Sequence, residues 1–283
     1  MAMPTFLIIG APKGGSTSLY HYVGQHPDVF TSAVKEPGFF WTYKTPGKVE
    51  TLEDYQALFR GSEGFKAVGE GSPTYLSDEN APRLIKDLVP HAKLVAILRD
   101  PYERAFSQFV FLRLRGQESE ESFLAAVEAD NARPASERSN YVAQGLYHRN
   151  LTRYLSFFDR SQLKVVFLED LEARPDEVVA EVFSFLEVDP SVGVDTSEKL
   201  TQSGVPRQKL VHWLLSDRNP VKQRLAPLLP KRVKKAVRQM RSANLDKQTM
   251  SRSDRQALAP HFEEDVDRLA QLLDRDLSHW RAN

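Results

Sequence analysis

Short apolar runs recur along the chain and are separated by amphipathic segments. Four of these runs are continuously apolar and rich in β-branched residues, and they span residues 5–10, 66–70, 93–99 and 163–170. Continuous apolarity over such short lengths is typical of strands that are buried on both faces, as in parallel sheets. We therefore expect four strands of one central sheet.

Apolar residues at helical spacing lie between and after these runs. The segments with this spacing span residues 17–24, 101–115, 150–158, 176–186 and 262–273. Asp100 and Pro101 strengthen the second helix, because aspartate caps a helix and proline suits its first turn. Strands that alternate with helices predict an α/β fold, a three-layer sandwich around a central mostly parallel sheet.

Length and composition favour a single folded unit over residues 1–283. Hydrophobic residues make up 41% of the 283 positions, enough to bury one large core. A polar excursion is expected at about 118–140 and a helical C-terminal part at about 208–283. Lysine plus arginine and aspartate plus glutamate each number 38, so the net charge gives no reason to expect nucleic acid as a partner.

One segment departs from this balance. Residues 221–241 carry eight basic side chains and no acidic one. A solvated basic helix is one interpretation, and a docking site for an acidic carrier protein is the other.

The chain lacks three features that would indicate a disulfide or thiolate site, a membrane span or secretion. The chain has no cysteine, which excludes disulfides, thiolate metal sites and cysteine nucleophiles. No run approaches the roughly 18 apolar residues of a membrane span, and the N-terminal segment lacks the basic start of a secretory signal. We expect a cytoplasmic protein with no membrane span.

The stretch GAPKGGSTS, residues 10–18, follows the first predicted strand. A strand that enters a glycine-rich turn and then a helix presents backbone N–H groups to an anion. Gly10 and Gly15 match the frame of a nucleotide-binding P-loop, but Ser16 stands where that loop has lysine, and Lys13 lies earlier. Asp170 is the one strand-end aspartate available for magnesium. The loop suits a phosphate group without the metal site used for triphosphates.

Further motifs accompany this loop. Read in chain order, they are PKGGSTSL, KEPGFFW, LRDPYERAFSQF, QGLYHRNLTRYLSFF, LKVVFLEDL and LDRDLSHW. In order and spacing they resemble the sulfotransferases that use 3′-phosphoadenosine 5′-phosphosulfate (PAPS), in the branch of the heparan sulfate N- and O-sulfotransferases and their bacterial relatives. The resemblance covers nearly the whole chain and implies a P-loop-like phosphosulfate-binding loop.

The resemblance implies roles for individual residues. Glu36 matches the acceptor-activating glutamate, although a surface pair with Lys35 is the alternative, and Pro37 favours an extended backbone at Glu36. Lys13 suits the phosphate oxygen that gains charge as the sulfonate leaves. Residues implied to bind PAPS are Lys13, Gly14, Gly15, Ser16, Thr17, Ser18, Arg99, Ser107, Arg207 and Tyr147. Residues implied to contact the acceptor are Lys35, Phe39 and Tyr75.

Arg99 and Ser107 match the family's contacts to the 3′-phosphate of PAPS, and Arg99 follows a strand end, where ligands of α/β proteins collect. Arg207 belongs to the stretch SGVPRQKL, which resembles a loop that closes over the nucleotide. For Tyr147 a purely structural role is the alternative.

The predicted reaction moves a sulfonate from PAPS to a hydroxyl or amine, leaves the bisphosphate PAP and requires no metal. The heparan sulfate enzymes carry a lysine after their second strand, where this chain has Gly71. This departure favours a small-molecule, lipid or carrier-bound acceptor over a polysaccharide. Residues 42–65 and 118–140 are expected to shape its site. A P-loop kinase or NTPase and a non-catalytic anion-binding module are the alternatives.

Overall fold

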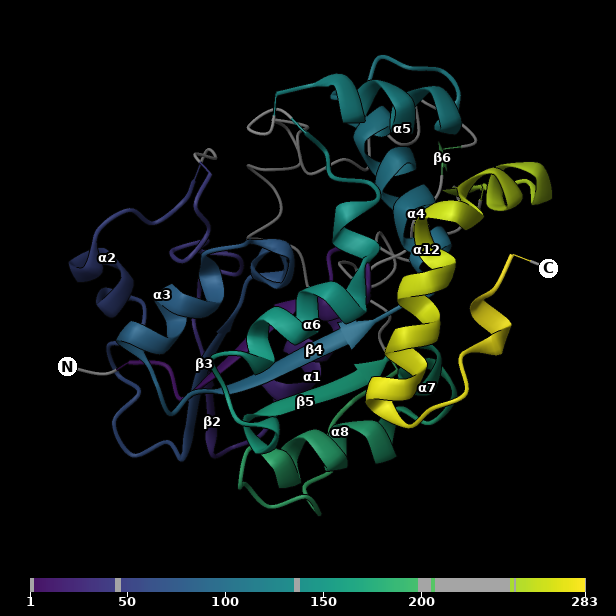
Figure 1. The fold of residues 1–283 in the computed structure, drawn as a ribbon. Coiled ribbons are helices and arrows are strands. Elements are labelled where there is room, and N and C mark those ends of the chain that lie inside the picture. The colour runs from purple at the N-terminus through teal and green to yellow at the C-terminus, as the bar shows by residue number, and fades with distance from the viewer. Residues whose placement is uncertain are drawn as a thin grey trace.

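A computed structural model describes residues 3–43, 47–134, 138–197 and 248–282, together with the backbone of 205–206 and 245–246. Its central sheet has five strands, all parallel, as expected for the α/β class (Figure 1). In spatial order the strands are β2 (Val29–Thr31), β3 (Ala67–Gly71), β1 (Phe6–Gly10), β4 (Lys93–Leu98) and β5 (Leu163–Phe167).

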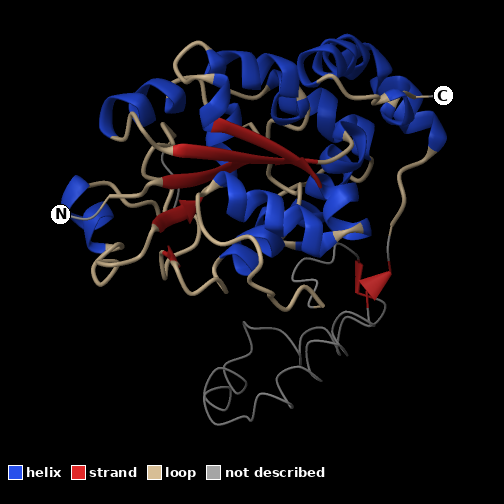
Figure 2. Cartoon of the chain, turned by 90° about the horizontal axis from the view of Figure 1, so that it is seen from below, coloured by secondary structure: helices blue, strands red, loops and turns tan. Residues whose placement is uncertain are grey.

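Both faces of this sheet are buried, which explains the continuous apolar runs. In β1, Phe6 and Ile8 pack on one face, while Leu7 and Ile9 pack on the other. Successive strand residues point to opposite faces, so a strand covered on both sides needs an apolar residue at every position. Figure 2 shows the strands between two layers of helices. The three-layer sandwich is confirmed.

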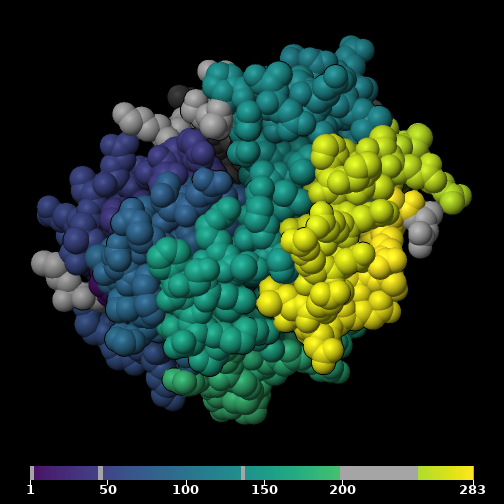
Figure 3. All heavy atoms as spheres, in the orientation of Figure 1, coloured from purple at the N-terminus to yellow at the C-terminus, as the bar shows by residue number. Residues whose placement is uncertain are grey.

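The two helical layers differ in size. One face packs against α1 (Ser16–Val23), α7 (Leu168–Ala173) and α8 (Pro175–Phe185). The other face packs against α2 (Leu52–Ala57), α3 (Ala81–Leu88), α4 (Pro101–Leu114), α5 (Phe123–Ala132), α6 (Tyr147–Leu155) and α12 (Arg252–Leu273). In Figure 3 the C-terminal residues lie directly against the middle of the chain, in agreement with the contacts of α12 with α4, α5 and α6.

The short elements complete the chain. They are the 3₁₀ turns η1 (Pro73–Ser77), η3 (Ala143–Gly145), η4 (Arg160–Gln162) and η6 (Ser278–Trp280), and the antiparallel pair β6 (Val205–Pro206) and β7 (Leu245–Asp246). Figure 2 shows this pair away from the main sheet. Within the described residues, no helix has the length and apolar character to cross a membrane.

Three expectations need correction. Strand β2 was not predicted, because three residues are too few to show a pattern. The fourth run ends as a strand at Phe167, and residues 168–170 begin α7 instead. Segment 118–140 is no simple surface excursion, since α5 runs through it with Phe123 buried, and the buried Glu118 is paired with Arg133.

The order of the strands creates a crevice at their carboxyl ends. Strands β1 and β4 are neighbours in the sheet. The helix after β1 is α1, which covers one face, whereas the helix after β4 is α4, which covers the other. The loops that leave these two strands therefore separate, and ligands of open α/β sheets bind in such crevices.

Candidate active site

A pocket of about 690 Å³ lies at these carboxyl ends. Its walls come from the loop between β1 and α1, from the segments after β3, β4 and β5, and from α4. The predicted site residues that line it are Lys13, Gly15, Ser16, Thr17, Ser18, Glu36, Arg99 and Ser107. The fold thus brings together residues from three separate motifs of the sequence.

The loop between β1 and α1 has the form of an anion site. Gly15 is the N-cap of α1 with φ 102°, a left-handed conformation that favours glycine. No side chain caps α1, and its first turn holds no acidic residue. Residues 15–18 line the pocket, so the N-terminus of α1 lies at the pocket wall without an acidic side chain of its own. Gly14 packs against β4 instead, where a Cβ would come within 2.6 Å of the Ile97 carbonyl oxygen.

Lys13 is a partly dehydrated cation in this pocket. Burial, reinforced by the charges of Arg99 and Arg115, lowers the pKa of its ammonium group to about 8. The Nζ atom lies 4.2 Å from the ring centroid of Phe111, a cation–π contact. An anion placed beside Lys13 would offset these costs, so the site favours negative charge.

Arg99 provides a second cation where β4 ends. Its guanidinium lies 3.2 Å from the Glu103 carboxylate one turn along α4, and its side chain is 26% exposed. Asp100 caps α4 by accepting hydrogen bonds from the N–H groups of Tyr102 (2.9 Å) and Glu103 (3.1 Å). The cap fixes the direction of α4, which places the buried Ser107 in the same pocket.

Tyr147 has a supporting position behind Arg99. It is fully buried, and its hydroxyl donates a 2.9 Å hydrogen bond to the Arg99 backbone oxygen. Tyr147 does not line the pocket, so the geometry fits the structural alternative.

Glu36 lines the pocket from a separate loop. Its side chain is 53% exposed and forms an ion pair with Lys35, so the surface pair and the pocket position coexist. The extended backbone expected before Pro37 is wrong, because Glu36 has φ 62°. The Glu36 N–H donates a 3.1 Å hydrogen bond to the Gly71 carbonyl oxygen, and this contact with the end of β3 defines the bend.

A buried carboxylate beneath this loop escaped the sequence analysis. Glu70 is fully buried in β3 and accepts hydrogen bonds from Ser72 (2.9 Å) and Tyr55 (3.3 Å). The Ser72 Oγ atom in turn accepts from the Gly38 N–H at 3.1 Å. Burial raises the pKa of Glu70 to about 7. Glu70 and Ser72 tie the loop that holds Glu36 to the sheet.

The residues implied to contact the acceptor lie apart from the pocket wall. Phe39 stacks on Tyr55 with the ring centroids 4.3 Å apart. Tyr75 is fully buried, and its hydroxyl accepts a 3.3 Å hydrogen bond from the Phe40 N–H. Lys35 reaches the pocket only through its pair with Glu36. Arg207 and the basic segment 221–241 lie outside the described residues.

Several further lining residues were not among the predicted site residues. They are Phe106, Val110 and Phe111 of α4, Arg115 directly after this helix, Leu168, Leu171, Glu172 and Pro175 after β5, and Pro73, Thr74, Thr196, Gln248 and Thr249. The spacing of Phe106 and Val110 could have indicated a shared face, because residues four apart lie side by side on a helix.

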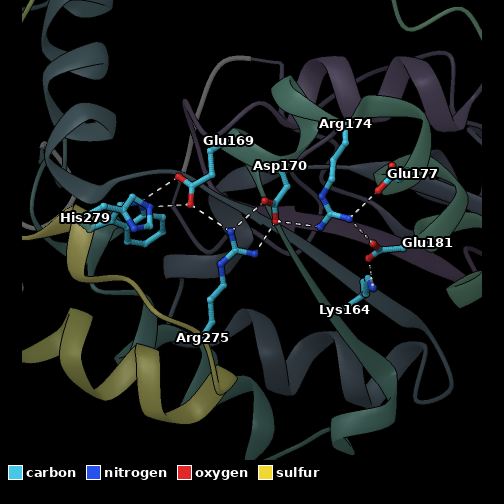
Figure 4. Close-up of polar contacts among 9 residues, drawn as sticks. Lys164, Glu169, Asp170, Arg174, Glu177, Glu181, Arg275 and His279 are labelled. Atoms are coloured by element: carbon cyan, nitrogen blue, oxygen red, sulfur yellow. Dashed lines mark hydrogen bonds and ion pairs between the residues drawn. The ribbon is translucent and has the colours of Figure 1, made fainter.

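Asp170 is committed to a structural network (Figure 4). Arg275 donates to its two carboxylate oxygens at 2.6 and 3.1 Å, and Arg174 lies 3.6 Å away. The neighbouring Glu169 accepts from the Trp280 indole at 3.1 Å. Asp170 does not line the pocket. No group of three or more His, Cys, Asp or Glu side chains within the described ranges is placed to hold a metal ion.

The fold and this pocket define an α/β protein whose glycine-rich loop has the geometry of an anion site. Residues 3–219 match the sulfotransferase domain family. The chain belongs to this family.

Individual relatives agree with this assignment. Human carbohydrate sulfotransferase 15 is 29% identical, with 66% of this chain and 44% of that protein covered. Human bifunctional heparan sulfate N-deacetylase/N-sulfotransferase 2 is 28% identical, with 66% of this chain and 22% of that protein covered. The chain thus spans less than half the length of either. A crystal structure of a sulfotransferase from Alicyclobacillus acidocaldarius superposes with a TM-score of 0.76 at 29% identity and covers 99% of both chains.

Proposed function

We propose that this chain transfers the sulfonate group of PAPS to a hydroxyl or amine of an acceptor. The observation that carries the proposal is the single pocket that unites the anion loop with Lys13, the second cation Arg99, and the carboxylate of Glu36. A doubly phosphorylated donor needs two cationic anchors, and an acceptor needs a base. The pocket supplies all three.

The residues present fit the donor. The uncapped N-terminus of α1 and the hydroxyls of residues 16–18 would hold its 5′-phosphate, and Arg99 with Ser107 would hold its 3′-phosphate. When bound, the donor supplies an electrophilic sulfonate and a bisphosphate leaving group. A phosphosulfate ligand also suits the position of Lys13, which lies earlier in the loop than the lysine of a nucleotide-binding P-loop.

Lys13 and Glu36 divide the chemistry between them. The acceptor oxygen or nitrogen forms a bond to sulfur while the bond from sulfur to the bridging phosphate oxygen breaks. Glu36 takes the proton of the acceptor, and the ammonium of Lys13 faces the phosphate oxygen that gains negative charge. Removal of one such donor from a charge-developing site typically costs about 3 kcal/mol in the transition state.

The acceptor that we propose is a small or carrier-bound molecule rather than a polysaccharide. The named human relatives act as carbohydrate and heparan sulfate sulfotransferases. At Gly71, the position of the glycan enzymes' lysine, an added Cβ would lie 3.0 Å from the Tyr20 ring. Tyr20 is held in place by a 2.7 Å hydrogen bond to the Ser32 carbonyl oxygen, so a longer side chain at 71 has little room.

Two substitutions separate donor binding from transfer. Glu36→Gln is expected to bind PAP as tightly as wild type and to lose at least about a hundredfold in turnover, since general base catalysis contributes 10²–10⁴-fold. Arg99→Ala is expected to weaken PAP binding about tenfold or more. Glu63→Gln, at an exposed position outside the pocket, is the control.

Calorimetry with PAP measures donor binding. Mass spectrometry of a metabolite extract incubated with PAPS measures transfer, as the gain of one sulfonate. Full activity of Glu36→Gln would refute the assigned base. Magnesium-dependent ATP hydrolysis without PAP affinity would instead favour an NTPase, and PAP binding without transfer across the extract would favour a binding module.

A further inference from the structure

The second half of α4 forms a wall of the pocket that the proposed donor contacts do not use. Phe106, Val110 and Phe111 line the pocket from this helix, and Arg115, which directly follows it, lines the pocket as well. The first two are almost completely buried and belong to the core beneath the wall. The wall is therefore a rigid apolar surface that ends in one cation.

Two cations contact the ring of Phe111. The Lys13 Nζ atom and the Arg115 Cζ atom each lie 4.2 Å from its centroid. The two charged groups are thus within twice this distance of each other. Arg115 therefore lies close to Lys13, which marks the proposed reacting centre.

Arg115 has no carboxylate partner among the residues that the structure describes, and its side chain is exposed. The nearby Arg113 does have partners within the fold. The guanidinium of Arg113 donates hydrogen bonds to the backbone oxygens of Glu120 (2.7 Å) and Ser119 (3.5 Å). Arg113 does not line the pocket. Of these two arginines at the end of α4, one is used by the fold and the other is presented to the pocket.

We propose that this wall is the acceptor subsite and that it selects amphipathic acceptors with an anionic group. The apolar body of the acceptor packs on the exposed part of Phe111, its hydroxyl or amine reaches Glu36, and its carboxylate, phosphate or sulfate pairs with Arg115. The inference rests on the proposed function and adds the chemical class of the acceptor.

The charges in the pocket give the physical reason. The phosphates of the donor would occupy Lys13 and Arg99 and would repel an acceptor of the same sign. A third cation at Arg115 offsets this repulsion, and its contact with Phe111 holds the guanidinium over the surface on which the acceptor packs. A forked guanidinium also fixes the direction of a carboxylate or phosphate, which orients the far end of the acceptor toward Glu36.

Matched pairs of probe acceptors test the selectivity. The pairs are 10-hydroxydecanoic acid with 1,10-decanediol, and 4-hydroxyphenylacetic acid with its methyl ester, each incubated with PAPS and analysed by mass spectrometry. The acid of a pair is expected to have about a tenfold higher kcat/KM, the effect of one hydrogen bond to a charged group. Equal turnover within both pairs would overturn the inference.

Variants of Arg115 identify the residue responsible. Arg115→Gln is expected to abolish the preference for the acid, and Arg115→Glu to reverse it toward the neutral partner. Arg113→Gln is the matched control and should keep the preference. The affinity for PAP should stay within about twofold in all three variants, whereas a large loss in Arg115→Gln would assign Arg115 to the donor and refute the proposal.

Two further outcomes distinguish failure of the acceptor proposal from failure of the proposed function. If no probe is sulfonated, calorimetry of the acids with the PAP complex decides, and absence of binding at millimolar concentration overturns the inference. A protein that fails to bind PAP refutes the proposed function itself. A protein that binds PAP and sulfonates neutral acceptors as well as acids refutes only the acceptor class.

Discussion

Lys13 combines a charge that the proposed reaction needs with a setting that weakens this charge. Burial is the largest cause of its lowered pKa, followed by the positive charges of Arg99 and Arg115. The left-handed backbone at Lys13, φ 63°, is uncommon for a residue with a side chain and directs it from inside the loop. The residue is therefore able to titrate near physiological pH.

We expect the kcat/KM for PAPS to fall as the pH rises through about 8. Below this value the ammonium of Lys13 is protonated in the free enzyme, and above it the anchor for the phosphate loses its charge. The measurement is kcat/KM for PAPS between pH 6 and 10 with one acceptor.

Two variants check that Lys13 causes this pH dependence. Lys13→Arg should lower the rate but remove the decline above pH 8, because an arginine stays protonated. Arg115→Gln should shift the decline to higher pH by removing a repelling charge. A decline unchanged in both variants would show that another group titrates.

At the scale of elements, strand β3 supports the loop that carries Glu36. Glu70 and Ser72 connect this strand to the Gly38 N–H, and the Gly71 carbonyl accepts from Glu36 itself. The loop has little regular structure of its own, so these bonds set the position of the proposed base. The charge state of Glu70 affects the stability of this arrangement.

The free energy of unfolding is expected to decrease as the pH rises from about 4.5 to 7. The pKa of Glu70 is about 7 in the folded chain and close to 4.3 in an unfolded one, so the folded state binds more protons in this window. Glu70→Gln should remove this contribution, by at most roughly 1.4 kcal/mol per pH unit. Urea denaturation at pH 5 and pH 8 measures it, with Glu63→Gln as control. An identical pH slope in Glu70→Gln and wild type would refute the assignment.

For the whole molecule, the helix α12 supports the proposed donor site, although the two are far apart in the sequence. Arg255 lies 2.6 Å from Asp100, the residue that caps α4 and follows Arg99. Its guanidinium also stacks on Tyr102 at 4.3 Å and donates to the Trp280 carbonyl oxygen at 2.7 Å. This helix lies beyond the residues that match the family, yet Gln248 and Thr249 before it line the pocket.

Arg255→Ala is expected to reduce the free energy of unfolding by about 3 kcal/mol, since it removes the ion-pair partner of a largely buried carboxylate, which then keeps only its bonds to the backbone of α4. It should also weaken PAP binding, because Asp100 then holds the start of α4 less firmly. Arg268→Ala is the control in the same helix, where an exposed pair with Glu264 contributes well under 1 kcal/mol. Equal losses in the two variants, by urea denaturation, would contradict this role.

The sequence by itself determined the class of fold and the proposed donor residues. The continuous apolar runs identified β1, β3, β4 and β5, and the loop of residues 10–18 was recognisable because its glycines, lysine and hydroxyls are contiguous. Asp100 and Pro101 marked the start of α4 for the same reason. Each of these strands, the loop and the helix start depends on residues that are close together in the chain, so a local sequence pattern predicts them.

Only the tertiary structure decided how these pieces meet. It placed Lys13 and Arg115 against the ring of Phe111, tied the loop of Glu36 to Glu70, and brought Arg255 to Asp100 across more than half of the chain. Side-chain contacts of this kind depend on the order of the strands and on which face of the sheet each helix covers. A single sequence carries no periodic signal for them, because the packing of distant segments determines which side chains come together.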